Sequence, residues 1–174
     1  MSNELKQKIA DLQHHFTNQP DAAIVKYHST SELKDGFKSN VQLRQHKLVV
    51  DEPKTIGGTD EGASPVELIL AALATCQEIS YKAYAVALGI PLTSVSVKLT
   101  GELDLKGFLG INKDTRPGFQ SIYGTVELVS DAPQEKLNEL KKIVDAHCPV
   151  LDILTNKVPV EITFEQDKQI KKIA

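Results

Sequence analysis

The chain has 174 residues, 41% of them hydrophobic, and a formal net charge of -3 without any basic block. A chain of this length buries an ordinary core without disulfide support, so we expect a single globular domain. The charge argues against nucleic acid and against an anionic membrane surface as partners. The N-terminus lacks the apolar core of a signal peptide, and charged residues break the apolar runs before they could span a bilayer. We therefore expect a cytoplasmic protein.

The first third of the chain predicts a helix followed by strands. One apolar stripe at helical spacing predicts an amphipathic helix over 3–17, formed by Leu5, Ile9, Leu12 and Phe16. We expect this stripe to dock on another part of the molecule. Three strand-like runs follow and suggest an antiparallel meander, at 22–29, 36–44 and 46–51.

A Pro- and Gly-containing loop then leads to a long apolar helix over about 65–89. Its start reads as a capping box, with Ser64 at the N-cap, Pro65 at the first helical position and Glu67 at the third. Gly89, followed closely by Pro91, ends it. Because few charged residues interrupt this helix, we expect it to be central and mostly buried.

The second half of the chain alternates between strand and helix patterns. Period-two alternation predicts strands over 94–104 and 120–130, joined by a long connection containing glycine. A helix from Pro133 to about His147, a short helix from Pro149 and a closing strand over Val158–Phe164 complete the pattern. The predicted class is α+β.

Two cysteines are the candidate reactive groups, because a pair of thiols in a reducing compartment is more often free or redox-active than a structural bridge. Cys76 lies within the apolar helix on a face of mostly small residues that includes Ala72, Ser80 and Ala83. Cys148 precedes Pro149 at an expected helix N-cap, where backbone N–H groups favour a thiolate. The alternative interpretation is that both are inert, since free cysteine often packs as a small hydrophobic residue.

The two cysteine segments together resemble the OsmC/Ohr family of thiol-dependent peroxidases. The resemblance rests on the run Gly57-Gly-Thr-Asp-Glu-Gly-Ala-Ser-Pro-Val-Glu-Leu-Ile-Leu-Ala-Ala-Leu-Ala-Thr-Cys76, on His147-Cys-Pro-Val-Leu-Asp and on Asn156-Lys-Val-Pro-Val160. Asp51-Glu-Pro, Gly107-Phe-Leu-Gly and Arg116-Pro-Gly-Phe place the chain in a divergent branch. The resemblance covers roughly residues 22–165. We therefore divide the chain into an N-terminal helical extension, 1–20, and an OsmC-like domain, 21–174.

The resemblance implies an intertwined homodimer in which antiparallel sheets wrap two long central helices, with active sites at the subunit interface. It implies that Cys76 attacks an organic hydroperoxide and becomes a sulfenic acid, which Cys148 resolves to a disulfide that an external thiol reductant reduces. No cofactor or metal is expected. His147, Cys148 and Asp152 lack the spacing of a zinc site.

The family pattern also includes an arginine and a glutamate that activate the peroxidatic thiol, and here the sequence departs from it. The glutamate directly follows the proline in the family, whereas Val66 occupies that position here and Glu67 follows. We keep Glu67 as a candidate catalytic residue, although on a regular helix it lies far around the axis from Cys76 and the capping box offers an explanation for it without catalysis. We expect Arg44, on the strand before the loop, to supply the cation, with His46, Lys38 and Arg116 as competitors.

Two other functions stay open. The departure at Val66 is compatible with a non-enzymatic binding protein that holds an apolar or thiol-reactive small molecule at the dimer interface. It is also compatible with a structural dimer whose thiols are inert. A Cys76 thiol pKa well below neutral favours catalysis over both alternatives.

Overall fold

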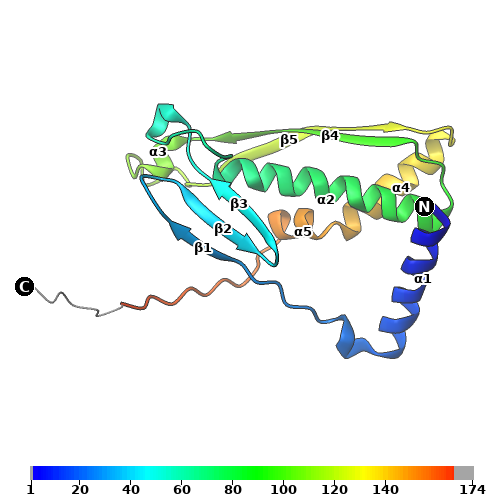
Figure 1. Cartoon of the computed structure of the whole chain (residues 1–174). Helices are drawn as coiled ribbons and strands as arrows, with labels where there is room; N and C mark the ends of the chain where they lie inside the picture. Colours follow the sequence, from blue (N-terminus) through cyan, green and yellow to red (C-terminus); the bar gives the residue numbers. More distant parts are fainter. Residues whose placement is uncertain (1, 167–174) are drawn as a thin grey trace, which may run out of the picture.

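A computed structural model describes residues 2–166 as an α+β fold built on one central helix (Figure 1). One antiparallel sheet has the order β1-β2-β3, and an antiparallel hairpin pairs β4 with β5. The strands are β1 (Thr30–Leu33), β2 (Ser39–Leu43), β3 (His46–Val50), β4 (Ser94–Leu103) and β5 (Phe119–Val129). The helices are α1 (Ser2–Asn18), η1 (Pro20–Ala23), η2 (Lys54–Ile56), α2 (Pro65–Leu88), α3 (Leu105–Phe108), α4 (Gln134–His147) and α5 (Pro149–Thr155).

Helix α2 begins and ends as its sequence predicts. The Ser64 N–H donates to Glu67 Oε2 at 2.7 Å, and the Glu67 N–H donates to Ser64 Oγ at 3.4 Å, which confirms the capping box. Gly89 follows with φ 69°, a left-handed conformation that glycine adopts without strain. Both ends of the helix that carries Cys76 are thus fixed by local interactions.

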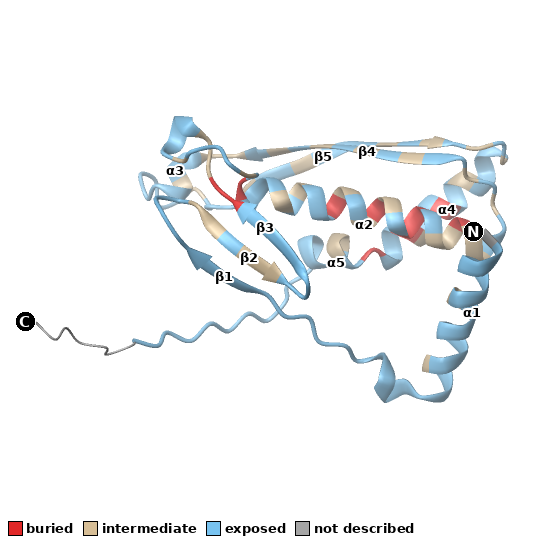
Figure 2. Cartoon of the chain, viewed as in Figure 1, coloured by how far each residue is buried: buried red, intermediate tan, exposed pale blue. Residues whose placement is uncertain are grey.

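The core forms where α2 meets α4. Tyr81 and Ala85 from α2 pack with Leu140 and Val144 from α4, and all four are almost fully buried (Figure 2). Partly buried residues of β4 and β5 pack against this cluster. The long β4–β5 hairpin runs along α2, while α4 and α5 pack on the same helix (Figure 1). This packing places the junction of α4 and α5 against the middle of α2.

The N-terminal helix is confirmed, whereas the strand expected at 22–29 is wrong. Helix α1 packs against α2, and η1 follows it. The chain then runs extended to β1 without pairing, and Ile24, Val25 and Tyr27 along it are exposed. Such β-branched and aromatic residues are typical of strands, but these have no sheet neighbour within residues 2–166. The first strand begins instead at Thr30, and the antiparallel meander of β1, β2 and β3 is confirmed.

A buried carboxylate holds the loop between β3 and α2. Asp51 is 1% exposed and accepts hydrogen bonds from the backbone N–H groups of Glu52, Thr59 and Glu61 and from the Thr59 hydroxyl. The Thr59 hydroxyl and these N–H groups lower the pKa of Asp51 to about 2 against the opposing effect of burial. Gly58 lies against the backbone here, since a Cβ on it would sit 1.8 Å from the Glu52 carbonyl oxygen. The loop that precedes α2 is therefore held by several hydrogen bonds.

The strand expected over Val158–Phe164 does not form within this chain. The segment is extended and exposed, and it runs away from α5 past the β1–β3 sheet (Figure 1). Its apolar residues alternate with polar ones but have no strand beside them in the described part of the chain, so the strand pattern is unpaired. The proposed boundary between 1–20 and 21–174 stays a prediction, and residues 167–174 of that domain lie outside the described structure.

Candidate functional site

The two thiols meet. Cys148 Sγ lies 3.3 Å from Cys76 Sγ, within sulfur hydrogen-bond distance, and no disulfide joins them. Cys76 projects from the middle of α2, and Cys148 occupies the single position between α4 and α5. Its backbone ends one helix and begins the next, because its N–H bonds the Val144 carbonyl and its own carbonyl accepts from Asp152. Its side chain makes no capping hydrogen bond, which leaves the thiol directed at Cys76.

The two thiols differ in accessibility. Cys148 is 1% exposed, whereas Cys76 is only partly buried. A reagent that arrives from solvent therefore meets Cys76 first. Cys148 is placed to react with a group already attached to Cys76.

The surroundings of Cys76 raise its thiol pKa from the usual 9.0. Burial is the largest cause, because it disfavours the charged thiolate. The Val150 backbone N–H acts against burial and lowers the pKa. The hydrogen bond and the charge of Cys148 raise the pKa further, and the Ser80 hydroxyl lowers it. None of these groups is a cation, so within residues 2–166 the thiol has hydrogen-bond donors but no positive charge beside it.

Glu67 is the partner of the N-cap residue Ser64 in the capping box of α2. Its carboxylate accepts from both the backbone N–H and the hydroxyl of Ser64, each at 2.7 Å, and these bonds lower its pKa. The carboxylate is thereby engaged at the helix start, about two and a half turns before Cys76. Glu67 is not among the described groups that shift the pKa of that thiol.

The positions of the candidate activating cations could not be predicted from the sequence. Arg44 lies in the turn between β2 and β3, not on the strand as expected, and has a left-handed φ of 55°. Two-residue hairpin turns require such angles, and this requirement overrode the strand pattern. Lys38 pairs with Glu61 at 3.0 Å, and His46 is the exposed first residue of β3.

Arg116 instead lies at a cavity of about 520 Å³ beside the start of α2. The cavity is lined from α2 by Val66, Ile69 and Leu73, from the strand connection and β5 by Arg116, Gly118, Phe119, Gln120, Ser121 and Ile122, and from α5 by Leu151, Leu154 and Thr155. Leu73 is three residues before Cys76, and Leu151 is three residues after Cys148. Apolar side chains of α2 and α5, together with Phe119 and Ile122, form most of its walls. The contribution of α5 was missed, because a seven-residue helix carries too short a pattern to show which face it buries.

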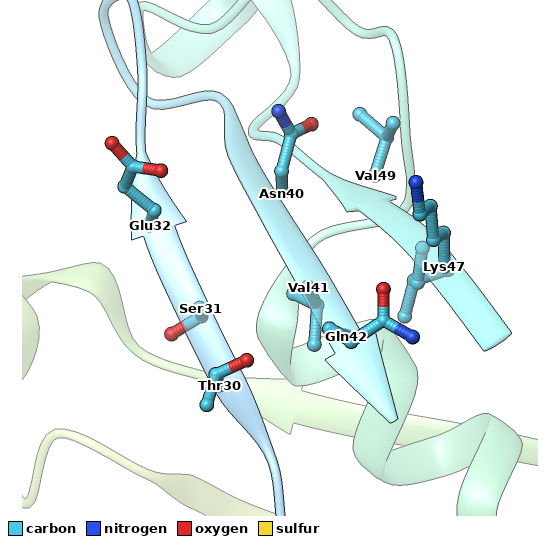
Figure 3. Close-up of a pocket in the computed structure, with 9 residues that line it drawn as sticks. Thr30, Ser31, Glu32, Asn40, Val41, Gln42, Lys47 and Val49 are labelled. Atoms are coloured by element: carbon cyan, nitrogen blue, oxygen red, sulfur yellow. The ribbon is translucent and has the colours of Figure 1, made fainter. Parts of the chain in front are cut away.

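Two further hollows lie outside the thiol pair. One, of about 730 Å³, lies between α2, α4 and the β4–β5 hairpin, and the buried residues Gln77 and Tyr81 line it. The other, of about 530 Å³, lies on the β1–β3 sheet among polar side chains that include Glu32, Asn40 and Lys47 (Figure 3). Neither cysteine lines these hollows, and neither lines the 520 Å³ cavity, which Leu73 and Leu151 bring close to the thiol pair.

Among the described helices, none combines the length and apolarity that a membrane crossing requires.

Solved structures with this fold are similar to the chain along most of its length. An OsmC-like protein from Mycoplasma pneumoniae matches with a TM-score of 0.66 and 23% identity, over 75% of this chain and 88% of that one. An organic hydroperoxide resistance protein OsmC from Legionella pneumophila matches at 0.59 and 19% identity, over 76% and 90%. An organic hydroperoxide resistance protein from Elizabethkingia anophelis, with thiocyanate bound, matches at 0.55 and 17% identity, over 75% and 88%.

No curated protein matches the chain. The sequence profile described as "OsmC-like protein" matches residues 58–163, which include all of α2, the β4–β5 hairpin and both cysteines. The chain therefore belongs to the OsmC-like protein family.

Proposed function

We propose that this protein is a thiol-dependent peroxidase that reduces organic hydroperoxides through Cys76 and Cys148. The observation that carries the proposal is the 3.3 Å separation of the two sulfurs. A disulfide needs two side chains that already approach each other in this way, and a contact between free thiols with unequal exposure suits a peroxidatic and a resolving cysteine. The hydroperoxide-resistance names of two similar structures support the same activity.

The reaction consists of two displacements at sulfur. The Cys76 thiolate attacks the terminal oxygen of R–O–OH, the O–O bond breaks, and RO⁻ takes a proton and leaves as an alcohol. Sulfur is oxidised by two electrons to the sulfenic acid as the peroxide is reduced. The Cys148 thiolate then attacks Cys76 Sγ, the S–S bond forms and the S–O bond breaks with loss of water. An external dithiol returns the disulfide to two thiols and is itself oxidised.

The cavity beside the start of α2 supports an organic substrate. Apolar side chains of α2, β5 and α5 form its walls, and Arg116 is its one charged residue. Such a site suits an apolar R group better than the small, strongly hydrated hydrogen peroxide molecule. We assign no cofactor, since the thiols supply the electrons.

We further propose that the active protein is a homodimer in which a partner subunit covers the exposed apolar residues and brings Arg44 to the site. Ile79 lies in the middle of α2 yet is 70% exposed, and the alternating residues of the 158–164 segment are exposed as well. A hairpin tip such as Arg44 can reach across an interface. Its guanidinium would supply the positive charge that Cys76 lacks within its own subunit.

A second function has two observations in its favour. Burial raises the pKa of Cys76, which disfavours the thiolate, and the 730 Å³ hollow with its buried Gln77 and Tyr81 could hold a small molecule. A non-enzymatic binding protein for an apolar or thiol-reactive compound would fit these two features.

Oxidation in the presence of peroxide tests the proposed activity against this alternative. The protein is treated with tert-butyl hydroperoxide or hydrogen peroxide, and intact mass reports disulfide formation in wild type and sulfenic acid in Cys148→Ser. Selective oxidation of Cys76 by the organic peroxide supports the peroxidase. Thiols that stay reduced under excess organic peroxide would overturn it.

A further inference from the structure

A second candidate site lies away from the thiols, in the hollow of about 730 Å³ between α2, α4 and the β4–β5 hairpin. Its volume lies within the range of about 300–1,000 Å³ that is typical of small-molecule sites. Apolar atoms make up most of its surface. The apolar side chains that line it come from all of these elements and include Leu73, Val97, Leu99, Val126, Leu128 and Leu137.

Gln77 is a buried polar residue of this hollow whose partner the fold does not supply. Leu73, Gln77 and Tyr81 follow one another at four-residue spacing, so they share the face of α2 that lines the hollow. Gln77 is 6% exposed, and within residues 2–166 its side-chain amide forms no hydrogen bond, which is unusual for a polar group buried to this extent. Every fully enclosed side-chain N or O atom of the described residues does have a partner. The Gln77 amide therefore borders open space, and the hollow is the open space that its side chain lines.

The charged groups at the hollow are already paired. Lys141 and Asp145 are the only charged residues among the described ones that line it, and they form an ion pair one turn apart on α4. The hydroxyl of Tyr123, another lining residue, donates to Glu102 at 3.1 Å. An ion that entered the hollow would lose its water without gaining a free counter-ion. The site therefore favours an uncharged ligand.

We propose that this hollow binds an uncharged, mostly apolar compound whose carboxamide head group is recognised by Gln77. The side-chain amide has one carbonyl that accepts and one NH₂ that donates, so a carboxamide can form two hydrogen bonds with it. The apolar part of the ligand lies on the hairpin and on α4, where burial stabilises it. The proposal gives the second candidate function its site and its ligand class, and it requires neither thiol.

Competition for a fluorescent dye tests the proposal. N-phenylnaphthylamine is uncharged and brightens in apolar surroundings, while octanamide and octanoate share a chain length and differ in charge. Gln77→Met removes the amide at nearly constant length, and Leu137→Trp fills the hollow from α4. Gln120→Met is the matched control, because Gln120 lines the 520 Å³ cavity and its amide already donates to backbone carbonyls. Circular dichroism checks the fold of each variant.

We expect saturable dye binding to wild type, with octanamide displacing the dye at much lower concentration than octanoate. Gln77→Met should still bind the dye but require about tenfold more octanamide, since it loses the hydrogen bonds to the head group. Gln120→Met should match wild type, and Leu137→Trp should lose most of the dye binding. Absent dye binding in wild type, or equal displacement from Gln77→Met and wild type, would overturn the site.

A variant without the exposed thiol separates this site from the proposed peroxidase. Cys76→Ser should bind the dye and octanamide as wild type does, and loss of binding there would place the ligand at the thiols and overturn the proposal. Oxidation of wild type by tert-butyl hydroperoxide is followed separately by intact mass. Binding without oxidation would leave this site standing and refute the peroxidase, and oxidation without binding would do the reverse.

Discussion

Cys76 Sγ lies 3.3 Å from Cys148 Sγ, although 72 positions separate the two residues along the chain. The contact depends on the break between α4 and α5, because Cys148 is the only residue between these helices. Pro149 begins α5 with no N–H to satisfy, so the chain can turn there and direct the Cys148 side chain at α2. The site therefore depends on backbone geometry as much as on the two thiols.

The pKa of Cys76 should respond to its neighbour. Burial and Cys148 both raise it, so removal of Cys148 by substitution with alanine should lower the pKa of Cys76, although not to a fully solvated value. Alkylation of wild type should accelerate as pH rises through and above 9.0, and the variant should reach the same rate at lower pH. Rate measurements between pH 6 and 10 check this. Superimposable profiles for the two proteins would show that the thiols do not interact.

Glu67 should matter for stability and not for thiol chemistry within one subunit. Glu67→Gln keeps an acceptor for the Ser64 N–H and should be nearly neutral, whereas Glu67→Ala loses half of the capping box and should lower stability by about 1 kcal/mol. Thermal unfolding measures both effects, and alkylation of Cys76 should not change in either variant. A slower reaction with peroxide in Glu67→Gln at unchanged stability would assign Glu67 to the site instead.

Asp51 should make the protein sensitive to acid. Its folded pKa is about 2, below the usual 3.8, so its contribution to stability is complete above pH 3.8 and is lost as pH falls through about 2. Asp51→Asn removes the charged acceptor from the loop and should lower the thermal midpoint at pH 7 by about 5 °C. The difference between wild type and variant should shrink as pH falls toward 2. A difference that is constant with pH would mean that the charge is not what holds the loop.

The exposed 158–164 segment should support self-association. Ile162 is 88% exposed in one subunit, and apolar side chains in an extended strand suit pairing with a second copy. Ile162→Asp should shift wild-type dimers toward monomers in light scattering, while Glu161→Gln, on the neighbouring residue, should not. An unchanged dimer in Ile162→Asp would exclude this segment from the interface, and a monomeric wild type would refute the proposed homodimer.

Local rules predicted most of the fold from the sequence. Ser64, Pro65 and Gly89 define the bounds of α2 through capping and backbone angles that involve only near neighbours. The errors occur where a nonlocal partner decides. Residues 22–29 and 158–164 both have strand-like sequences, but a strand forms only beside another strand, and the described chain offers them none.

The site could be predicted only in part for the same reason. The sequence indicated both cysteines, and the fold brings them together. The sequence placed Arg44 on a strand, because Arg and Gln are not residue types that indicate a two-residue hairpin turn. The Val150 N–H could not be found at all, because a backbone donor has no signature in the sequence.

Peptide mapping after brief treatment with one equivalent of tert-butyl hydroperoxide tests the central claim most directly. The account predicts an intramolecular Cys76–Cys148 disulfide in wild type, reversible by a dithiol, and a sulfenic acid on Cys76 in Cys148→Ser. Two reduced thiols after excess organic peroxide, or a sulfenic acid that forms first on Cys148, would contradict it.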